Sequence, residues 1–94
     1  MREIILTPKF KRAFRKFVNR NNRLQNHIEE TLKLMHNDLF TPELGTHKLS
    51  GELLGLYACI CGYDCRIVFS IEHNKETMNE MIILLDIGTH DEVY

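Results

Sequence analysis

The sequence predicts a small α+β domain in which an antiparallel pair of helices packs on one face of a mostly antiparallel sheet, in the order β-α-α-β-β-β. Apolar residues recur with helical spacing between residues 8 and 37. Short apolar runs bounded by turn residues, which are typical of strands, lie at residues 2–6 and in the second half of the chain. A length of 94 residues with 44% hydrophobic content predicts one domain, residues 1–94, with a single modest core.

The N-terminal segment predicts a strand followed directly by a helix. Residues 2–6 are a short apolar run with two isoleucines, which favours a strand. Thr7 and Pro8 follow, and these residue types are preferred at the N-cap and the first position of a helix. Apolar residues then form one continuous stripe at helical spacing: Phe10, Ala13, Phe14, Phe17 and Val18.

A second helix is predicted after a short turn. Three asparagines between residues 19 and 22 interrupt the first pattern and indicate a turn. A new apolar stripe then leads to a helix end near residue 37: Leu24, Ile28, Leu32 and Met35. The connection is short, so we expect the two helices to form an antiparallel hairpin.

The second half of the chain predicts a loop and three strands. Residues 39–50 contain a proline and a glycine and predict a loop. We expect the strands at residues 52–61, 65–72 and 80–87. A turn at residues 62–64 and a polar hairpin loop at residues 73–76 would join them. Residues 81–85 are apolar at every position, which predicts that the last strand is central and covered on both faces.

Charge is distributed unevenly along the chain, although the formal net charge is only −1. Residues 1–23 contain eight basic residues against Glu3 alone, whereas residues 24–94 contain four basic and twelve acidic residues. Such asymmetry indicates a polyanionic or acidic partner for the basic part, and the alternative is a solvated helix face that needs no partner. Basic residues cover the exposed surface of the first predicted helix: Lys9, Lys11, Arg12, Arg15 and Lys16.

The three cysteines, Cys59, Cys61 and Cys65, all fall within predicted strands. There is no Cys-X-X-Cys pair, and strand residues two apart are too extended for comfortable shared chelation, so a zinc site is the less favoured alternative. No apolar run approaches membrane-spanning length, and residues 1–6 do not have the character of a signal peptide. We therefore expect a cytoplasmic protein whose cysteines are free, partly buried thiols.

Residues suited to metal-free cleavage of RNA are spread over the second half of the chain: His47, Asp64, Arg66 and His90. Antiparallel strands can bring such distant positions onto one patch. Attack of an RNA 2′-hydroxyl on the adjacent phosphorus needs a base, an acid for the leaving 5′-oxygen, and positive charge on the phosphoryl oxygens. Taken singly, each residue also has an ordinary explanation, since Asp64 fits a turn and Arg66 could pair with a nearby carboxylate.

Several segments together resemble the RelE/ParE superfamily of bacterial toxins, and within it the YafQ-like ribosome-dependent endoribonucleases. They are the segment His-Lys-Leu-Ser-Gly at residues 47–51, the Leu-X-Gly-X-Leu-X-Gly-Leu-Tyr run at residues 49–57, the Asp64/Arg66 turn, and the Gly-Thr-His ending at residues 88–90. The resemblance covers nearly the whole chain and implies a RelE-like fold.

The resemblance implies a role for each of the four residues. His90 is expected to be the acid, and Arg66 to clamp the phosphate. His47 is expected to be a base or a phosphate ligand, and Asp64 a base or the orienter of a histidine. The assignment of base and acid among His47, Asp64 and His90 stays open. Some YafQ-like members carry another histidine in the strand before the aspartate, where this chain has Ala-Cys-Ile-Cys at residues 58–61.

Three further residues are expected to support substrate binding by the same resemblance. Lys48 would give electrostatic support, and Tyr94 would stack on a base or hold the phosphate. Tyr63 could stack in the same way, although packing of the turn is an equal alternative. The remaining histidines are expected to be structural or exposed: His27, His36 and His73.

The resemblance implies a toxin of a type II toxin–antitoxin system that cleaves mRNA in the ribosomal A site. Its implied partners are the ribosome, mRNA and a cognate antitoxin in a hetero-oligomeric complex, with no metal, cofactor or membrane. The basic helix would contact ribosomal RNA or the antitoxin through Lys9, Arg12, Arg15 and Lys16. Two alternatives remain: a ParE-like toxin that binds DNA gyrase without cleaving RNA, and an inactive relative that only binds an antitoxin.

Overall fold

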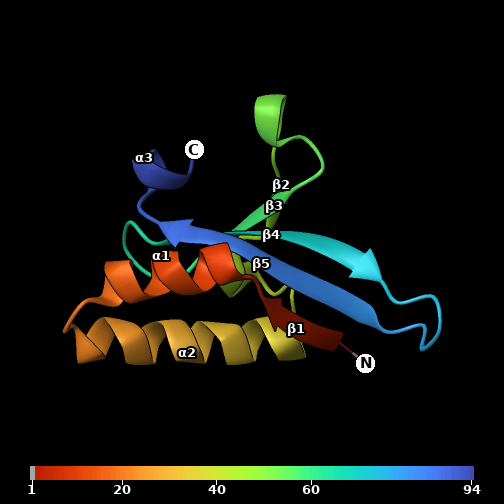
Figure 1. Ribbon diagram of the computed structural model, residues 1–94, viewed down its shortest axis with the longest axis horizontal. Helices are drawn as coiled ribbons and strands as arrows, with labels where there is room; N and C mark the ends of the chain where they lie inside the picture. The colour runs from red at the N-terminus through yellow and green to blue at the C-terminus, as the bar shows by residue number, and fades with distance from the viewer. Residues whose placement is uncertain (1) are drawn as a thin grey trace.

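The computed structural model describes residues 2–94 and contains a five-stranded sheet (Figure 1). The strands are β1 (Arg2–Leu6), β2 (His47–Lys48), β3 (Tyr57–Ile60), β4 (Arg66–His73) and β5 (Glu80–Gly88). The helices are α1 (Pro8–Val18), α2 (Asn22–Asn37) and α3 (His90–Val93), with single 3₁₀ turns η1 (Pro42–Leu44) and η2 (Gly51–Leu53). Of the helices in residues 2–94, none combines the length and apolar character needed to cross a bilayer.

The sheet has the strand order β1-β5-β4-β3-β2. β1 runs parallel to β5, and every other neighbouring pair is antiparallel. This confirms the predicted α+β class with a mostly antiparallel sheet. Figure 1 shows α2 on one side of the sheet and α3 with η2 on the other side.

The predicted start of the first helix is confirmed at atomic detail. The Oγ1 atom of Thr7 accepts a hydrogen bond from the backbone N–H of Phe10 at 3.1 Å, as an N-cap does. The same hydroxyl donates to the backbone carbonyl of Leu84 in β5 at 2.7 Å, so Thr7 also fastens α1 to the sheet. Asn21 caps α2 in the same way, accepting from the N–H of Leu24 at 3.0 Å.

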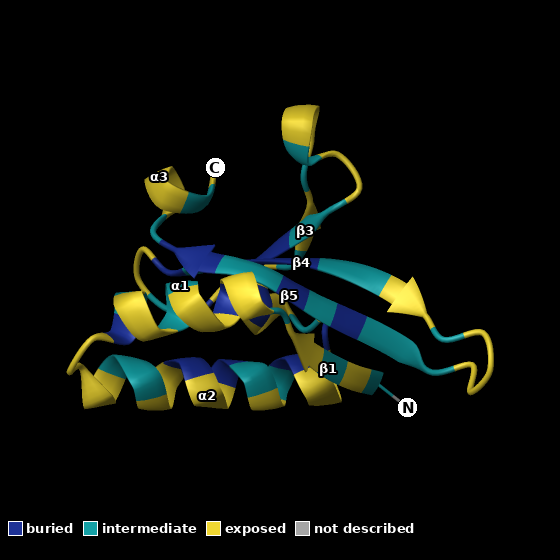
Figure 2. Cartoon of the chain, viewed as in Figure 1, coloured by how far each residue is buried: buried dark blue, intermediate teal, exposed yellow. Residues whose placement is uncertain are grey.

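The core lies between the two long helices and one face of the sheet (Figure 2). Phe10 of α1, Ile28 and Met35 of α2, and Phe69 and Leu84 of the sheet are all fully buried. The apolar stripes predicted for both helices therefore face this core. Burial of such side chains supplies the main stabilisation, at roughly 1.5–3 kcal/mol for each one.

The strand predicted at residues 52–61 is wrong over its first half. Gly51 and Gly55 have positive φ angles of 66° and 95°, which no extended strand contains. The chain instead turns through η2, where the N–H of Leu54 donates to the carbonyl of Gly51. β3 begins only at Tyr57, and the short strand β2 lies inside the segment that the sequence predicts as a loop.

The prediction that the last strand is internal is confirmed, because β5 lies between β1 and β4. The expected cover on both faces is wrong. Ile82 and Leu84 are fully buried, whereas the alternate residues Ile83 and Leu85 are only half-buried. The long helices pack on one face only, so the second face of the sheet is left for other contacts.

Candidate functional site

A cleft of about 440 Å³ lies between the η2 loop and the C-terminal residues. Its lining residues are His47, Leu49, Ser50, Glu52, Leu53, Val93 and Tyr94. We call it the His47–Tyr94 cleft. Its volume is within the range of small-ligand sites, and its walls mix apolar and polar side chains as such sites do.

His47 reaches the cleft from β2, on the sheet face that the long helices leave open. It lies opposite Ala58 of β3, which in turn lies opposite Val68 of β4, so the three share one face. The Nδ1 atom of His47 is 3.0 Å from the carbonyl oxygen of Gly45. A carbonyl can only accept, so this contact is a hydrogen bond when Nδ1 carries the proton, and in that neutral tautomer Nε2 is the acceptor. His47 therefore presents a nitrogen that can take up a proton.

Arg66 begins β4 on the same face as His47. It lies opposite Ile60 on one side and Gly88 on the other, two residues from Val68. Its Nη1 donates to the carbonyl of Cys65 at 2.9 Å, which holds the half-buried side chain against the turn. Within residues 2–94 Arg66 makes no ion pair, so its charge is available to an anion.

Helix α3 folds back over the end of β5 and was not predicted from the sequence. Thr89 caps it, because its Oγ1 accepts from the N–H of Glu92 while Oε1 of Glu92 accepts from the N–H of Thr89 at 2.8 Å. A Cβ atom on Gly88 would lie 3.0 Å from this Oε1. The glycine therefore lets α3 approach the strand beside Arg66.

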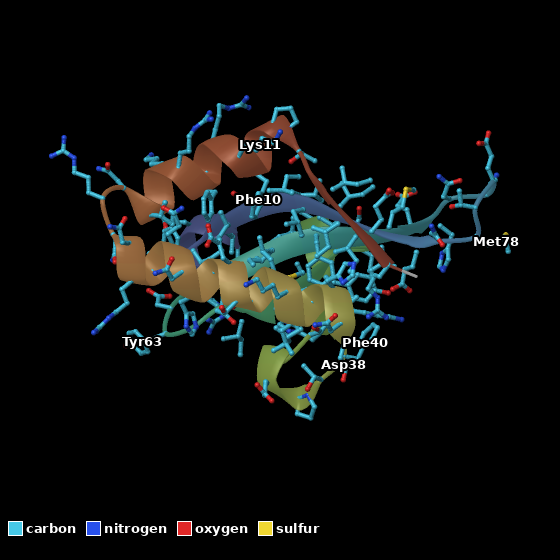
Figure 3. All side chains as sticks on the ribbon, turned by 90° about the horizontal axis from the view of Figure 1, so that it is seen from below. Phe10, Lys11, Asp38, Phe40, Tyr63 and Met78 are labelled. Atoms are coloured by element: carbon cyan, nitrogen blue, oxygen red, sulfur yellow. A yellow bond between two sulfur atoms is a disulfide. The ribbon has the colours of Figure 1, made fainter. Side chains whose placement is uncertain are left out.

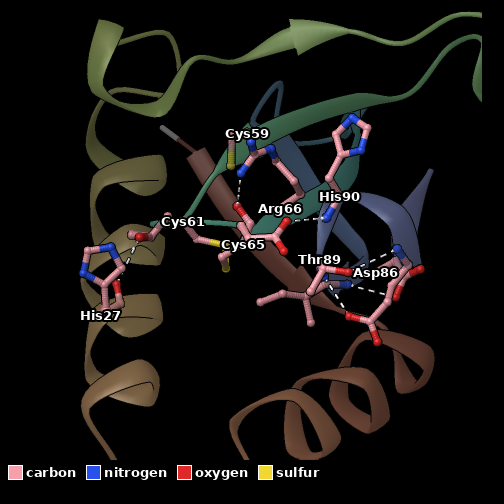
Figure 4. Close-up of a disulfide and its surroundings, with 12 residues drawn as sticks. His27, Cys59, Cys61, Cys65, Arg66, Asp86, Thr89 and His90 are labelled. Carbon is pink, nitrogen blue, oxygen red and sulfur yellow. Dashed lines mark hydrogen bonds between the residues drawn. A yellow bond between two sulfur atoms is a disulfide. The ribbon is translucent and has the colours of Figure 1, made fainter.

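Asp64 connects the β3–β4 turn to α3. Its Oδ1 accepts a hydrogen bond from the backbone N–H of His90 at 3.1 Å, across 26 residues of sequence. Asp64 has a φ angle of 49°, in the left-handed region that aspartate tolerates better than most residues. Figure 4 shows Arg66 and His90 on neighbouring elements beside this turn. Asp64 thus fixes the place of the His90 backbone.

His90 of α3 packs against Tyr94, the residue that caps the C-terminal end of this helix. Their ring centroids are 4.6 Å apart at an interplanar angle of 85°, an edge-to-face contact. The Nδ1 atom of His90 lies 3.5 Å from Oδ1 of Asp91. Burial raises the pKa of the Tyr94 phenol, while the nearby positive charge of Arg66 acts in the opposite direction. Tyr94 therefore links His90, Arg66 and the wall of the His47–Tyr94 cleft.

Comparison with protein families decides where this chain belongs. The family described as bacterial toxin of type II toxin–antitoxin system, YafQ, matches residues 2–94. The chain belongs to this YafQ toxin family. A search of curated protein sequences finds no match.

Solved structures of YafQ toxins and their relatives share the fold. YafQ from Escherichia coli superposes with a TM-score of 0.78 at 12% identity, covering 100% of this chain and 99% of that one. A YoeB/ParE toxin from Agrobacterium tumefaciens gives 0.74 at 11% identity, covering 94% and 98%. The E. coli DinJ–YafQ toxin–antitoxin complex gives 0.71 at 14% identity, covering 99% and 97%. At these identities the likeness establishes the RelE-like fold.

The cysteines of this YafQ family member differ from the expectation of three free thiols. Cys61 and Cys65 form a disulfide across the turn that carries Asp64 (Figure 4). Both lie just outside β3 and β4, and the N–H of Cys61 donates to the carbonyl of Cys65 at 3.0 Å. The expectation is therefore wrong for this pair. It holds for Cys59, a free buried cysteine whose thiol pKa is raised to about 12 by burial.

Two of the predicted substrate-binding residues lie outside the His47–Tyr94 cleft. Lys48 follows His47 in β2 and lines a separate hollow with Leu54 and Tyr57. Tyr63 is fully exposed in the β3–β4 turn, where Figure 3 labels it. It borders a hollow beside α2. The predicted basic surface of α1 is exposed: Lys9, Arg12, Arg15 and Lys16.

Sequence reasoning missed most of the lining of the cleft. Ser50 and Glu52 supply polar atoms, and Leu49, Leu53 and Val93 supply apolar walls. The glycines at 51 and 55 were a usable signal, since they indicate a folded loop in place of a strand. No local pattern pointed to the contact of this loop with the C-terminal residues.

Proposed function

We propose that this chain is a toxin that stops translation by cleaving mRNA in the ribosomal A site. The observation that carries the proposal is the set of chemical groups around one cleft: a proton-accepting nitrogen of His47, and Tyr94 in contact with His90 and near Arg66. Membership of the YafQ toxin family supports the same conclusion.

In the proposed reaction the 2′-hydroxyl of the mRNA attacks the adjacent phosphorus. Nε2 of His47 takes the 2′-proton, the new O2′–P bond forms, and the P–O5′ bond breaks. His90 gives a proton to the departing 5′-oxygen, which leaves a 2′,3′-cyclic phosphate and a 5′-hydroxyl end. The guanidinium of Arg66 stabilises the negative charge that gathers on the phosphoryl oxygens.

Asp64 acts in this proposal as a positioning residue. Its Oδ1 accepts the N–H of His90, and that bond positions the backbone from which the His90 side chain extends. We assign the general base to His47, because it lines the cleft and its accepting nitrogen has no partner among the hydrogen bonds of residues 2–94.

A cognate antitoxin is the proposed partner in the resting state. The E. coli YafQ structure that shares this fold is named as a toxin–antitoxin complex with DinJ. The exposed basic side chains of α1 offer a surface for an acidic antitoxin segment, or for ribosomal RNA once the antitoxin is lost. Lys48 would add positive charge from the hollow next to the cleft.

The test is primer extension on a defined mRNA with purified ribosomes present or absent. We expect cleavage within A-site codons only when ribosomes are present, and loss of cleavage in His90→Ala. His73→Ala is the matched control, because His73 is an exposed histidine at the far end of β4. Absence of cleavage by the native protein would refute the proposal, and inhibition of DNA gyrase in a supercoiling assay would then support the ParE-like alternative.

A further inference from the structure

The His47–Tyr94 cleft holds two polar side chains, those of Ser50 and Glu52, that have no hydrogen-bond partner among residues 2–94. Ser50 makes no side-chain capping bond to η2. The carboxylate of Glu52 is exposed, and among residues 2–94 it has neither a hydrogen bond nor an ion pair. Both line the cleft between the apolar side chains of Leu49, Leu53 and Val93. Apolar walls around polar groups suit a flat heterocycle, whose faces can contact the walls while its edges bond to the polar groups. A carboxylate that serves only to be solvated does not require apolar neighbours.

The loop that carries Glu52 is folded on itself. The N–H of Leu49 donates to the carbonyl of Leu56 at 2.9 Å, which closes the neck of the loop. Inside it, Leu53 and Leu54 donate to the carbonyls of Ser50 and Gly51. These bonds hold the wall of the cleft in place before anything binds, which lowers the entropy cost of recognition.

Opposite charges lie in the cleft and near its edge. Glu52 lines the cleft and repels phosphate. Arg66 is not part of the lining, but its charge acts on Tyr94 at the edge of the cleft and attracts phosphate there. His47 and Glu52 line the same cleft, so an RNA strand with its phosphate at His47 has a base within reach of the Glu52 wall. The carboxylate selects for base edges that carry hydrogen-bond donors, because an ionised carboxylate can only accept.

We propose that this cleft is a nucleobase pocket in which Glu52 determines specificity for guanine next to the cleaved bond. Guanine alone presents two adjacent donors, N1–H and the N2 amino group, that can meet both oxygens of one carboxylate. Adenine, cytosine and uracil offer a carboxylate only one donor group on that edge. The apolar walls and the Tyr94 ring accept the faces of the base. The inference rests on the proposed nuclease function and names its substrate preference.

The first test compares guanosine with inosine, which lacks only the N2 amino group, at each position of the A-site codon. We expect the native protein to cleave the guanosine message roughly tenfold faster at one position, the effect of one hydrogen bond to a charged group. Glu52→Gln should reduce this ratio to near one. Glu43→Gln should keep it, because Glu43 is an exposed glutamate in the 3₁₀ turn η1 and lines a different cleft.

Equal guanosine-to-inosine ratios in the native protein and Glu52→Gln would overturn the inference while leaving the nuclease function intact. A second measurement needs no ribosome and no cleavage. In it, 2′-O-methyl trinucleotides with guanosine or inosine are titrated into the protein, and methyl NMR signals of Leu49, Leu53 and Val93 are followed. Tighter binding of the guanosine form that Glu52→Gln abolishes supports the pocket even if cleavage fails; equal binding of both forms refutes it.

Discussion

The two faces of the sheet are built for different purposes. On the face covered by α1 and α2, Cys59, Ile67 and Phe69 are completely buried in the hydrophobic core. On the other face, His47 and Arg66 keep part of their surface in solvent. The comparison teaches that adjacent residues of one strand can have different roles. Ile67 stabilises the core, whereas its neighbour Arg66 faces the proposed site. Substitutions on the two faces should therefore affect different measurements.

The largest effect is expected from a truncation on the covered face. Phe69→Ala removes a fully buried ring that stacks on Tyr57 with centroids 5.8 Å apart. We expect a loss of about 3–5 kcal/mol in the free energy of unfolding, measured by urea denaturation. Leu54→Ala is the control, because Leu54 is 79% exposed and its loss should cost less than about 0.5 kcal/mol. Similar losses in both variants would contradict the assignment of this face as the core.

A substitution on the open face should lower activity and leave stability almost unchanged. Arg66→Gln removes the charge proposed to stabilise the phosphoryl oxygens, and we expect cleavage by the ribosome-bound protein to slow by about 10²–10³-fold. The free energy of unfolding should change by less than about 1 kcal/mol, since Arg66 makes no ion pair within residues 2–94. Full activity together with lost stability would show that Arg66 belongs to the scaffold.

The disulfide bridges the turn between β3 and β4, and its loss should have an intermediate effect. Closing the five-residue segment from Cys61 to Cys65 restricts the unfolded chain, which corresponds to about 2 kcal/mol. We expect reduction with dithiothreitol to lower the unfolding free energy by this amount in the native protein. The double variant Cys61→Ala/Cys65→Ala should not respond to the reductant. A response of equal size in the double variant would trace the effect to something other than this bond.

The smallest effect is expected at Asp64. Asparagine can also accept the N–H of His90 and tolerates the left-handed backbone of this position, so Asp64→Asn should retain cleavage within a few-fold. Asp64→Ala loses both properties and should lower stability by about 1 kcal/mol. If Asp64→Asn slowed cleavage by 10²-fold or more, the carboxylate would be acting as a base.

The covered face could be predicted from the sequence almost completely. The apolar stripes from Phe10 to Val18 and from Leu24 to Met35 repeat at helical spacing, and Thr7 and Asn21 cap both helices. These signals are local, because each depends on residues only a few positions apart. Burial alternates along β5 because helices cover only one face of the sheet. The alternation could not be predicted, because the residues on both faces of this strand are apolar.

The open face could be predicted only in part. His47, Asp64, Arg66 and His90 were selected by their chemistry and given roles by the family resemblance, and the structure brings Asp64 to the backbone of His90. The fold-back of α3 and the position of Glu52 depend on contacts between segments far apart in sequence. The Cys61–Cys65 bond was missed because both residues were assigned to strands, whereas they flank the turn.

The parallel pairing of β1 with β5 has a consequence for the speed of folding. Arg2 lies opposite Glu80, so this ladder closes a loop of most of the chain. Contacts of such long range are slow to form because the closure entropy is lost before the pairing stabilises the chain. β5 also leads directly into α3, which carries His90. We therefore expect the pairing of β1 with β5 to be among the slowest contacts to form, on the strand that leads into the proposed catalytic His90.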